Sequence, residues 1–194
     1  MRPLVLASTS PFRRDLLMRL RLPFETAAPD VDETRRMGEA AQDLVVRLAE
    51  AKARAVAPSH PAALIIGSDQ VACLGSTILG KPGDRETAIA QLEQTSGQAV
   101  TFLTGLCLLE GAHGPARVLC EPFRVHFRAL TRAQIEAYVD RERPFNSAGS
   151  IRSEGLGVAL FERLEGDDPA ALIGLPLIRL TQLLQEAGVD VLAA

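Results

Sequence analysis

Residues 4–14, LVLASTSPFRR, set the start of the fold. The four apolar residues predict a buried strand, and the hydroxyl-rich segment after them predicts a polar turn. Ser10 and Pro11 are residue types favoured at the N-cap and at the first position of a helix. Leucines at positions 16, 17 and 20 give that helix an apolar face to bury. The stretch therefore predicts a strand, a turn and a helix in succession.

The rest of the chain continues to mix strand and helix patterns. Further strands are expected at residues 63–67, 99–109 and 117–128, with a hairpin over residues 71–79. Further helices are expected at residues 39–57, 84–96, 131–141 and 176–188. The strand at 63–67 is expected to end at the polar residues Ser68, Asp69 and Gln70. The mixture of strands and helices predicts an α/β or α+β fold, with one curved, mixed sheet flanked by helices.

Composition and charge exclude several classes of protein. Hydrophobic residues make up 47% and charged residues 23%, so the chain is not disordered, and 194 residues suit a single domain, 1–194. The net charge of −3 provides no basic field for a long nucleic acid, so local charges must hold any phosphate ligand. Three widely spaced cysteines without a C-x-x-C motif indicate free thiols. No apolar run is long enough for a membrane span, so we expect a cytoplasmic protein.

The segment from Ser8 to Arg14 is a candidate anion site. The free N–H groups at the start of a helix attract anions, and hydroxyls and arginines add directed donors. Arg13 and Arg14 lie where the helix dipole disfavours cations, and a bound anion would offset that cost. Alternatively, both arginines lie on a solvated helix surface.

Further candidate site residues are Asp69, Lys52 and Lys81. A carboxylate at the polar end of an apolar strand is typical of a metal ligand or a general base, although a turn aspartate commonly caps its own backbone. Lys52 lies beside the apolar face of its helix, so it either reaches inward or extends to solvent. Lys81, in Gly80-Lys81-Pro82, places a positive charge where glycine permits close approach, but no Walker loop is present.

Two acidic segments complete the candidates. Residues 30–33, DVDE, offer oxygen ligands for a divalent cation, although most acidic loops are only solvated. Glu154 lies among small residues in the glycine-rich segment 149–157, where it either faces a ligand or is an ordinary loop acid.

In their order along the chain, these segments resemble the Maf family of nucleotide pyrophosphatases. The resemblance rests on residues 6–11 with 13–14, 31–33, 68–71, 80–82, 96–97, 148–150 and 174–176. It extends from residue 4 to residue 176, so it covers nearly the whole chain. It implies a mixed α/β fold similar to the inosine triphosphate pyrophosphatases, with two lobes and a central cleft.

The resemblance also implies a reaction. Maf proteins use a divalent metal to split nucleoside triphosphates into a monophosphate and pyrophosphate. Asp69 would be the catalytic base or a metal ligand, with Glu33 as a second metal ligand for Mg²⁺, Mn²⁺ or Co²⁺. The residues expected to bind phosphate are Ser8, Arg13, Arg14, Lys52 and Lys81. A homodimer is implied as well, with a small-molecule nucleotide as partner and neither long nucleic acid nor membrane.

Within the family, three positions are similar to the 7-methyl-GTP pyrophosphatase branch, namely Phe12, Gln70 and Glu154. N7-methylation makes guanine cationic, and an aromatic face attracts a cation by about 0.5–2 kcal/mol. The branch often has tryptophan where Phe12 stands, and phenylalanine is the weaker cation–π face. A carboxylate at Glu154 accepts both N1–H and N2–H of guanine. Alternatively, Phe12 belongs to the core with Leu16, one turn along the helix.

Two rival functions stay open at the level of sequence. One is a pyrophosphatase of the same family for dTTP, UTP or another modified nucleotide, against which Phe12 and Glu154 argue. The other is a nucleotide-binding regulator of septum formation with little turnover. Binding alone needs no general base, so Asp69, Lys52 and Lys81 weigh against it.

Overall fold

The structure is a computed structural model that describes residues 2–193. The chain divides into two compact units. The first comprises Met1–Asp69, Thr104–Glu121 and Asp168–Ala194, and the second comprises Gln70–Leu103 and Pro122–Asp167. Each unit is described by itself below. The single functional domain expected from the sequence stays a prediction.

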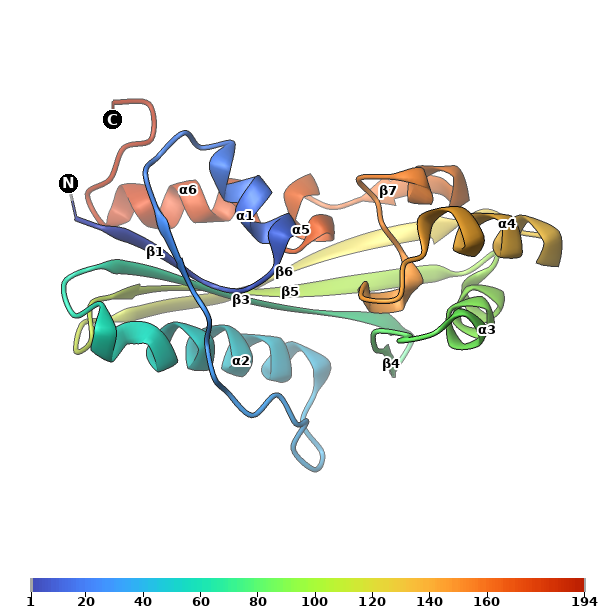
Figure 1. Ribbon diagram of the computed structural model, residues 1–194, viewed down its shortest axis with the longest axis horizontal. Helices are drawn as coiled ribbons and strands as arrows, with labels where there is room; N and C mark the ends of the chain where they lie inside the picture. The colour runs from blue at the N-terminus through green and yellow to red at the C-terminus, as the bar shows by residue number, and fades with distance from the viewer. Residues whose placement is uncertain (1, 194) are drawn as a thin grey trace. The chain divides into compact units, whose positions relative to one another are not determined.

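The described residues form a mixed sheet of seven strands. The strands are β1 (Leu4–Ala7), β2 (Glu25–Ala27), β3 (Leu64–Leu74), β4 (Thr77–Leu79), β5 (Ala99–Glu110), β6 (Ala116–Phe127) and β7 (Phe161–Glu165). Their order is β2-β1-β3-β5-β6-β7, with β4 paired to β3 (Figure 1). β1 is parallel to β2 and β3, whereas the pairs β3–β4 and β6–β7 are antiparallel. The mixed sheet expected from the sequence is confirmed.

Six α-helices and three short 3₁₀ segments are present in residues 2–193. The helices are α1 (Pro11–Met18), α2 (Ala41–Val56), α3 (Arg85–Thr95), α4 (Arg132–Glu142), α5 (Pro169–Ile173) and α6 (Leu177–Glu186). The 3₁₀ segments are η1 (Ala57–Ser59), η2 (Ala148–Ser150) and η3 (Leu156–Leu160). None of the helices in this part of the chain combines the length and apolar character needed to cross a bilayer.

In the first unit, helices cover both faces of the sheet. Leu4 and Leu6 of β1 belong to a core with α1 and α6, whereas Val5 and Ala7 belong to a core with α2. Successive side chains of a strand point to opposite faces, so β1 contributes to both cores. Figure 1 shows α2 on one face and α1, α5 and α6 on the other.

Two glycines let α2 lie very close to the sheet. A Cβ at Gly67 of β3 would lie 2.0 Å from the carbonyl oxygen of Ala49, and one at Gly105 of β5 would lie 2.1 Å from that of Val45. No real Cβ fits at such distances, so only glycine is compatible with this approach. The close contact brings the inner face of α2 against the residues that follow Gly67 in β3.

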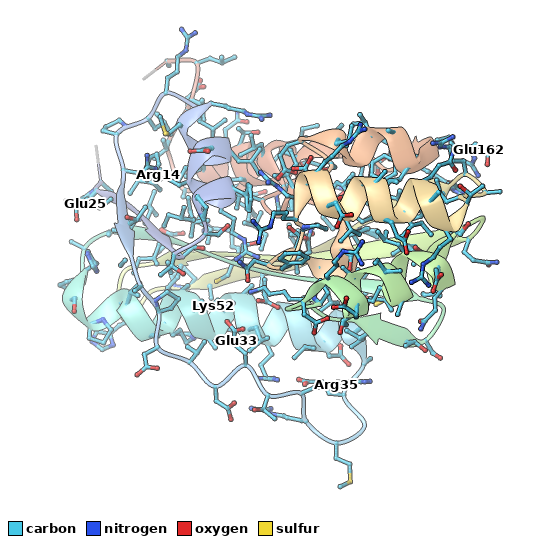
Figure 2. The ribbon with its side chains drawn as sticks, turned by 45° about the vertical axis from the view of Figure 1, so that its right-hand side comes forward. Arg14, Glu25, Glu33, Arg35, Lys52 and Glu162 are labelled. Atoms are coloured by element: carbon cyan, nitrogen blue, oxygen red, sulfur yellow. The ribbon has the colours of Figure 1, made fainter. Side chains whose placement is uncertain are left out.

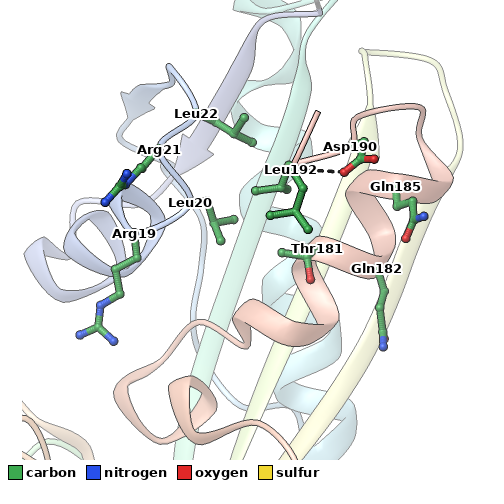
Figure 3. Close-up of a pocket in the computed structure, with 10 residues that line it drawn as sticks. Arg19, Leu20, Arg21, Leu22, Thr181, Gln182, Gln185, Asp190 and Leu192 are labelled. Carbon is green, nitrogen blue, oxygen red and sulfur yellow. Dashed lines mark hydrogen bonds between the residues drawn. The ribbon is translucent and has the colours of Figure 1, made fainter. Parts of the chain in front are cut away.

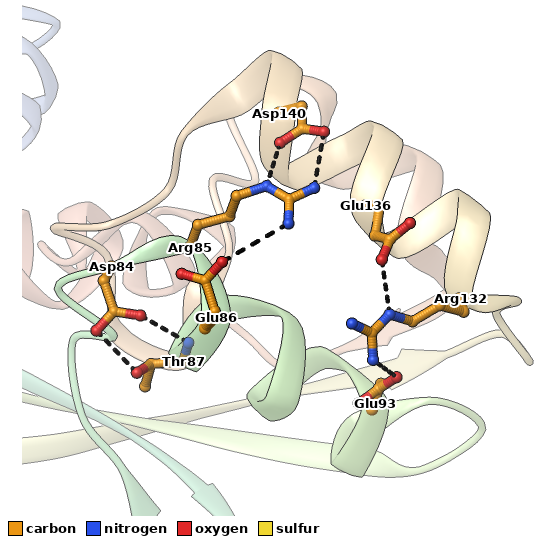
Figure 4. Close-up of polar contacts among 8 residues, drawn as sticks. All are labelled: Asp84, Arg85, Glu86, Thr87, Glu93, Arg132, Glu136 and Asp140. Carbon is orange, nitrogen blue, oxygen red and sulfur yellow. Dashed lines mark hydrogen bonds and ion pairs between the residues drawn. The ribbon is translucent and has the colours of Figure 1, made fainter.

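In the second unit, α3 and α4 are joined by ion pairs at their surface. Arg85 of α3 forms a two-point contact with Asp140 of α4, with distances of 2.6 and 3.0 Å (Figure 4). Arg132 of α4 lies 2.7 Å from Glu93 of α3 and 2.8 Å from Glu136. Such exposed ion pairs each contribute about 0–1 kcal/mol to the stability of the folded protein.

Most elements expected from the sequence are confirmed, but one strand end is wrong. β3 does not end at Ser68, Asp69 and Gln70; it continues to Leu74. The polar side chains do not interrupt it because they find partners inside the fold, as described below. Two strands and one α-helix were not expected at all, namely β2, β7 and α5. Each is five residues long or shorter, so its sequence carries little periodic signal.

A cavity of about 590 Å³ lies in the first unit between the end of α1 and α6 (Figure 3). Its lining residues are Arg19, Leu20, Arg21, Leu22, Thr181, Gln182, Gln185, Asp190, Val191 and Leu192. No candidate site residue lines this cavity.

Candidate active site

Ser68 and Asp69 point to opposite faces of β3 because side chains alternate along a strand. Asp69 shares its face with Gly67 and Ile65, and Ile65 belongs to the core formed with α2. Asp69 therefore points toward α2. The hydroxyl of Ser68 donates on the other side to the carbonyl oxygens of Gly105 and Gly174, at 2.8 and 2.9 Å. Both polar residues are satisfied, which explains why β3 continues through them.

Lys52 of α2 joins two carboxylates. Its Nζ lies 2.6 Å from Oδ1 of Asp69 and 2.6 Å from Oε1 of Glu33. Figure 2 shows Glu33 on the loop beside α2, near Lys52. Lys52 and Asp69 retain only 6% and 8% of their surface exposure, so this is a buried ion pair with a more exposed third member. Of the two sequence interpretations, Lys52 reaches inward.

The loop that carries Glu33 is held to α2 by Arg47. Nε and Nη2 of Arg47 donate to the carboxylate of Glu39 at 2.6 and 2.8 Å, and Nη2 also donates to the carbonyl oxygen of Thr34 at 3.2 Å. The hydrogen bonds from Arg47 to the Glu39 carboxylate, with one from the backbone N–H of Arg36, lower the pKa of Glu39 from 4.5 to about 2. Sequence reasoning missed Arg47 and Glu39, which lie eight positions apart.

The turn before α1 is organised by two serines. Ala7 pairs with Gly67, so Ser8 follows the end of β1 beside Ser68 of β3. Ser8 is buried, and its hydroxyl oxygen accepts the backbone N–H of Ser10 at 3.1 Å. Ser10 in turn caps α1, as the sequence predicts, by accepting the backbone N–H of Arg13 at 3.4 Å.

Arg13 lies near the two carboxylates of Asp69 and Glu33. Its Nε donates to the carbonyl oxygen of Gly174 at 2.9 Å. Burial lowers the pKa of Arg13, and the nearby charges of Asp69 and Glu33 counteract part of this shift. An arginine keeps its proton despite such a shift. The first unit thus places two cations and two carboxylates in one cluster.

Arg14 lies outside this cluster. Its side chain is exposed on α1 (Figure 2), and the side chain forms no ion pair or hydrogen bond among residues 2–193, although the backbone N–H donates to the carbonyl oxygen of Ser10 at 3.2 Å. Consecutive helical residues point about 100° apart, which explains why only one of the two arginines turns inward. Within residues 2–193, no hydrogen bond or ion pair joins the Arg14 side chain to Glu33, Lys52 or Asp69.

The acidic pair can accept a divalent cation. Asp69 and Glu33 both contact the same atom, Lys52 Nζ, so the two carboxylates lie close together beside one ammonium group. Residues 2–193 contain no group of three or more His, Cys, Asp or Glu side chains suited to a metal. Mg²⁺ usually takes only one or two carboxylates and completes its shell with waters and substrate phosphates. The donor set fits that mode of binding.

Lys81 belongs to the second unit, in the loop between β4 and α3, and it is exposed. The carbonyl oxygen of Gly80 accepts the side-chain amide of Gln91 at 3.2 Å and the backbone N–H of Gly149 at 3.3 Å. The hydroxyl of Ser150 also donates to Gln91, at 2.6 Å. Gln91 therefore connects the lysine loop to the glycine-rich segment.

The three residues expected to recognise the base are placed as follows. Gln70 begins the second unit, directly after Asp69 in β3, and is half-buried. Glu154 lies in the exposed loop before η3, where its Oε1 is 3.5 Å from Nε of Arg152. Phe12, in the first unit, is half-buried, whereas Leu16 is fully buried in the core. Phe12 is therefore not a fully buried core residue.

Comparison with known proteins places the chain in a family. The sequence profile of the Maf-like protein family matches residues 3–187. The chain belongs to the Maf-like family. The family resemblance drawn from the ordered motifs is confirmed.

Curated relatives of this Maf-like protein are similar along nearly their whole length. A protein of Nitrosococcus oceani is 59% identical over 97% of this chain and 95% of its own length. A protein of Alcanivorax borkumensis is 59% identical over 96% of this chain and 95% of its own length. A protein of Pseudomonas aeruginosa is 56% identical over 97% and 98%. Each of the three is named 7-methyl-GTP pyrophosphatase.

Solved structures share the fold of this Maf-like protein at low sequence identity. A HAM1 protein from Coxiella burnetii matches with a TM-score of 0.54 and 16% identity, covering 96% of this chain and 100% of that chain. The Ham1 protein of Staphylococcus aureus matches with a TM-score of 0.52 and 15% identity, covering 97% and 100%. At such identities the likeness concerns the fold alone.

Proposed function

We propose that this protein is a nucleoside triphosphate pyrophosphatase that hydrolyses 7-methyl-GTP to 7-methyl-GMP and pyrophosphate. The observation that carries the reaction type is the buried contact of Lys52 with Asp69, extended by Glu33 and Arg13. The names of relatives that are 56–59% identical support the substrate.

Asp69 is the proposed general base. Its carboxylate takes a proton from a water molecule as the water oxygen attacks the α-phosphorus. The bond from the α-phosphorus to the bridging oxygen then breaks, and pyrophosphate leaves. A positioned base of this kind accelerates a reaction by about 10²–10⁴-fold. The hydrogen bond from Lys52 fixes the direction of the Asp69 carboxylate.

Positive charges balance the triphosphate. Arg13 and Lys52 supply two of them within the first unit, and the capped start of α1 adds backbone N–H groups beside Ser8. Lys81 contributes from the second unit. Arg14, which is exposed, has a weaker and longer-range role in this proposal. Fixed donors of this type stabilise the charge that develops in the transition state.

A divalent cation, Mg²⁺, Mn²⁺ or Co²⁺, belongs to the proposal. Asp69 and Glu33 would hold it beside the Lys52 ammonium, since both carboxylates lie next to that group. When bound, such an ion lowers the pKa of a water molecule and screens phosphate charge. Arg47 and Glu39 would keep the Glu33 loop in place for this purpose.

Base recognition is assigned to Phe12, Gln70 and Glu154. Phe12 is half-buried, as expected of an aromatic ring that keeps one face available, and a cationic methylguanine favours such a face. The carboxylate of Glu154 suits the two N–H donors of guanine. A uracil or thymine offers no such pair of donors, so these residues disfavour dTTP and UTP.

The test is a panel of 7-methyl-GTP, GTP, UTP and dTTP, with pyrophosphate release measured in the presence of Mg²⁺ or Mn²⁺. Phe12→Ala should lower the 7-methyl-GTP to GTP ratio of kcat/KM about five- to thirtyfold. Glu154→Gln should lower kcat/KM for both guanine nucleotides and leave kcat/KM for UTP nearly unchanged. Phe24→Ala, at a half-buried phenylalanine packed on the core, and Glu162→Gln, at an exposed acid of β7, are matched controls.

Three results would contradict the proposal. Preferred hydrolysis of UTP or dTTP would place the protein in another branch of the family. Tight nucleotide binding without turnover would favour a regulator. If Phe12→Ala lowered kcat/KM equally for all substrates, Phe12 would be a packing residue. The homodimer expected from the family stays a prediction, which light scattering of the purified protein would test.

A further inference from the structure

Glu142 occupies a position that is unfavourable for an acid. It is the last residue of α4, where the carbonyl ends of the helix dipole repel negative charge. Its side chain is only 13% exposed, so the carboxylate has also lost most of its water. Such a charge is stable only with good partners. The partners of Glu142 show which segment its carboxylate fixes in place.

Both partners lie in the loop that carries Glu154. Oε1 of Glu142 lies 3.0 Å from Nη1 of Arg152, and Oε2 accepts the backbone N–H of Leu156 at 2.7 Å. These two residues flank Glu154, two positions on either side. Between them, a Cβ at Gly155 would lie 2.8 Å from both carboxylate oxygens of Glu142, so the backbone rests directly on the carboxylate.

Tyr138 holds the same segment one turn earlier on α4. Its hydroxyl accepts the backbone N–H of Arg152 at 3.0 Å and donates to the carbonyl oxygen of Ser150 at 3.2 Å. Burial raises the pKa of this phenol, so the hydroxyl keeps the proton that it donates. Residues four apart lie on the same helix face, so Tyr138 and Glu142 form one row of attachment points.

The contacts of Glu142 extend to Glu154 through Arg152. Arg152 lies between two acids, with Nη1 on Glu142 and Nε 3.5 Å from Oε1 of Glu154. Glu142 therefore acts on Glu154 in two ways, through the backbone at Gly155 and Leu156 and through the guanidinium of Arg152. Glu154 keeps 26% of its side-chain surface exposed, which leaves it accessible to a ligand.

We propose that Glu142 is a positioning residue that, together with Tyr138, orients the Glu154 carboxylate for the paired N–H donors of guanine. This proposal rests on the proposed function, because it assigns guanine recognition to Glu154. Glu142 acts on the substrate only through the loop, so its loss affects recognition of the base rather than cleavage of the phosphate chain.

The experiment compares Glu142→Ala and Glu142→Gln with the wild type on 7-methyl-GTP, GTP and UTP. The alanine variant loses every contact of the Glu142 carboxylate but keeps those of Tyr138, and it should raise KM for both guanine nucleotides about tenfold. Its kcat for these nucleotides and its kcat/KM for UTP should be nearly unchanged. The glutamine variant keeps an acceptor for the N–H of Leu156 and should restore part of the loss. Because it preserves size and shape, it also serves if the alanine variant folds poorly.

Asp140→Asn is the matched control. Asp140 lies two residues earlier on α4 and, like Glu142, pairs with an arginine, but its partner is Arg85 of α3 (Figure 4). Its replacement should lower the melting temperature slightly and leave the guanine to UTP ratio of kcat/KM unchanged. If Glu142→Ala and Glu142→Gln behave like this control, Glu142 only stabilises the fold and the proposal is wrong.

A double variant separates this proposal from the proposed function. If Glu142 acts through Glu154, adding Glu142→Ala to Glu154→Gln should cause no further loss of guanine preference. A full additional loss would overturn the proposal while leaving the function intact. If the wild type shows no guanine preference, the proposed function fails, and the role of Glu142 fails with it.

Discussion

Asp69 and Lys52 are both buried, and neither charge would be stable there alone. Removing one partner of a buried ion pair typically costs about 3–5 kcal/mol, because the other charge is left without compensation. Here Lys52 has a second carboxylate, Glu33, at the same 2.6 Å distance. The loss of charge at Asp69 alone is therefore tolerable for the fold, which makes this residue suitable for a chemical test.

Asp69→Asn should lower kcat by about 10²–10⁴-fold while nucleotide binding and the melting temperature change little. Asparagine keeps the size of the side chain but cannot take a proton from water, and Lys52 keeps its contact with Glu33. Steady-state kinetics and a nucleotide-binding titration provide the measurement. Asp30→Asn, in the exposed acidic loop, is the control. More than about a tenth of wild-type activity in Asp69→Asn would show that Asp69 is not the base.

Among the elements, α5 depends most on its surroundings. A helix of five residues is far too short to be stable alone. Asp168, which is buried, accepts the N–H of Ala170 at 3.1 Å and the N–H groups of Ile178 and Arg179 at 2.7 and 3.2 Å. One carboxylate thus holds the start of α5 and the start of α6. The carbonyl oxygen of Gly174, at the end of α5, then accepts hydrogen bonds from Arg13 and Ser68.

Asp168→Ala should lower the free energy of unfolding by about 2–3 kcal/mol, because it removes a cap and leaves buried N–H groups unsatisfied. It should also raise KM for every triphosphate, since Gly174 no longer holds Arg13 in place. Urea unfolding and kinetics on two different bases test both effects. The exposed neighbour Asp167 provides the control, Asp167→Ala. A change in the ranking of bases would show that α5 does not act through the phosphate site.

At the scale of the whole molecule, ion pairs make the fold sensitive to acid. Several carboxylates have a pKa below the ordinary value because arginines or backbone N–H groups bind their charged form. Their contribution to stability is complete above the ordinary pKa of a carboxylate. It is lost as the pH falls toward the lower pKa of the folded state. Stability should therefore be constant near neutral pH and decrease below about pH 5.

Glu39 offers the clearest case, because Arg47 lowers its pKa from 4.5 to about 2. Glu39→Gln should be less stable than the wild type at pH 7, and the difference should shrink between pH 4.5 and about pH 2. Melting temperatures across this range, at low and high salt, give the measurement, and Glu86→Gln at an exposed position of α3 is the control. A difference that persists at pH 2 would mean that Glu39 acts through packing instead of charge.

The sequence by itself determined the features that depend on near neighbours in the chain. The cap Ser10 before Pro11, the capping box of Thr131 and Gln134, and the hairpin turn at Gly75 all involve residues within four positions. The alternation of apolar and charged residues in β6 is equally local. The ordered motifs determined the family, and they contain Arg13, Glu33 and Asp69.

Only the tertiary structure decided which of these residues meet. Arg13 meets the carbonyl oxygen of Gly174 across 161 positions, and Glu33, Lys52 and Asp69 come from a loop, a helix and a strand. Their convergence depends on how closely α2 packs on Gly67 and Gly105, which no local period encodes. Packing also turned Arg13 inward and left Arg14 outside, and it satisfied Ser68 and Asp69 so that β3 continued through them. The contact of Glu142 with the Glu154 loop has the same origin, since a buried carboxylate selects its partners from what the fold places beside it.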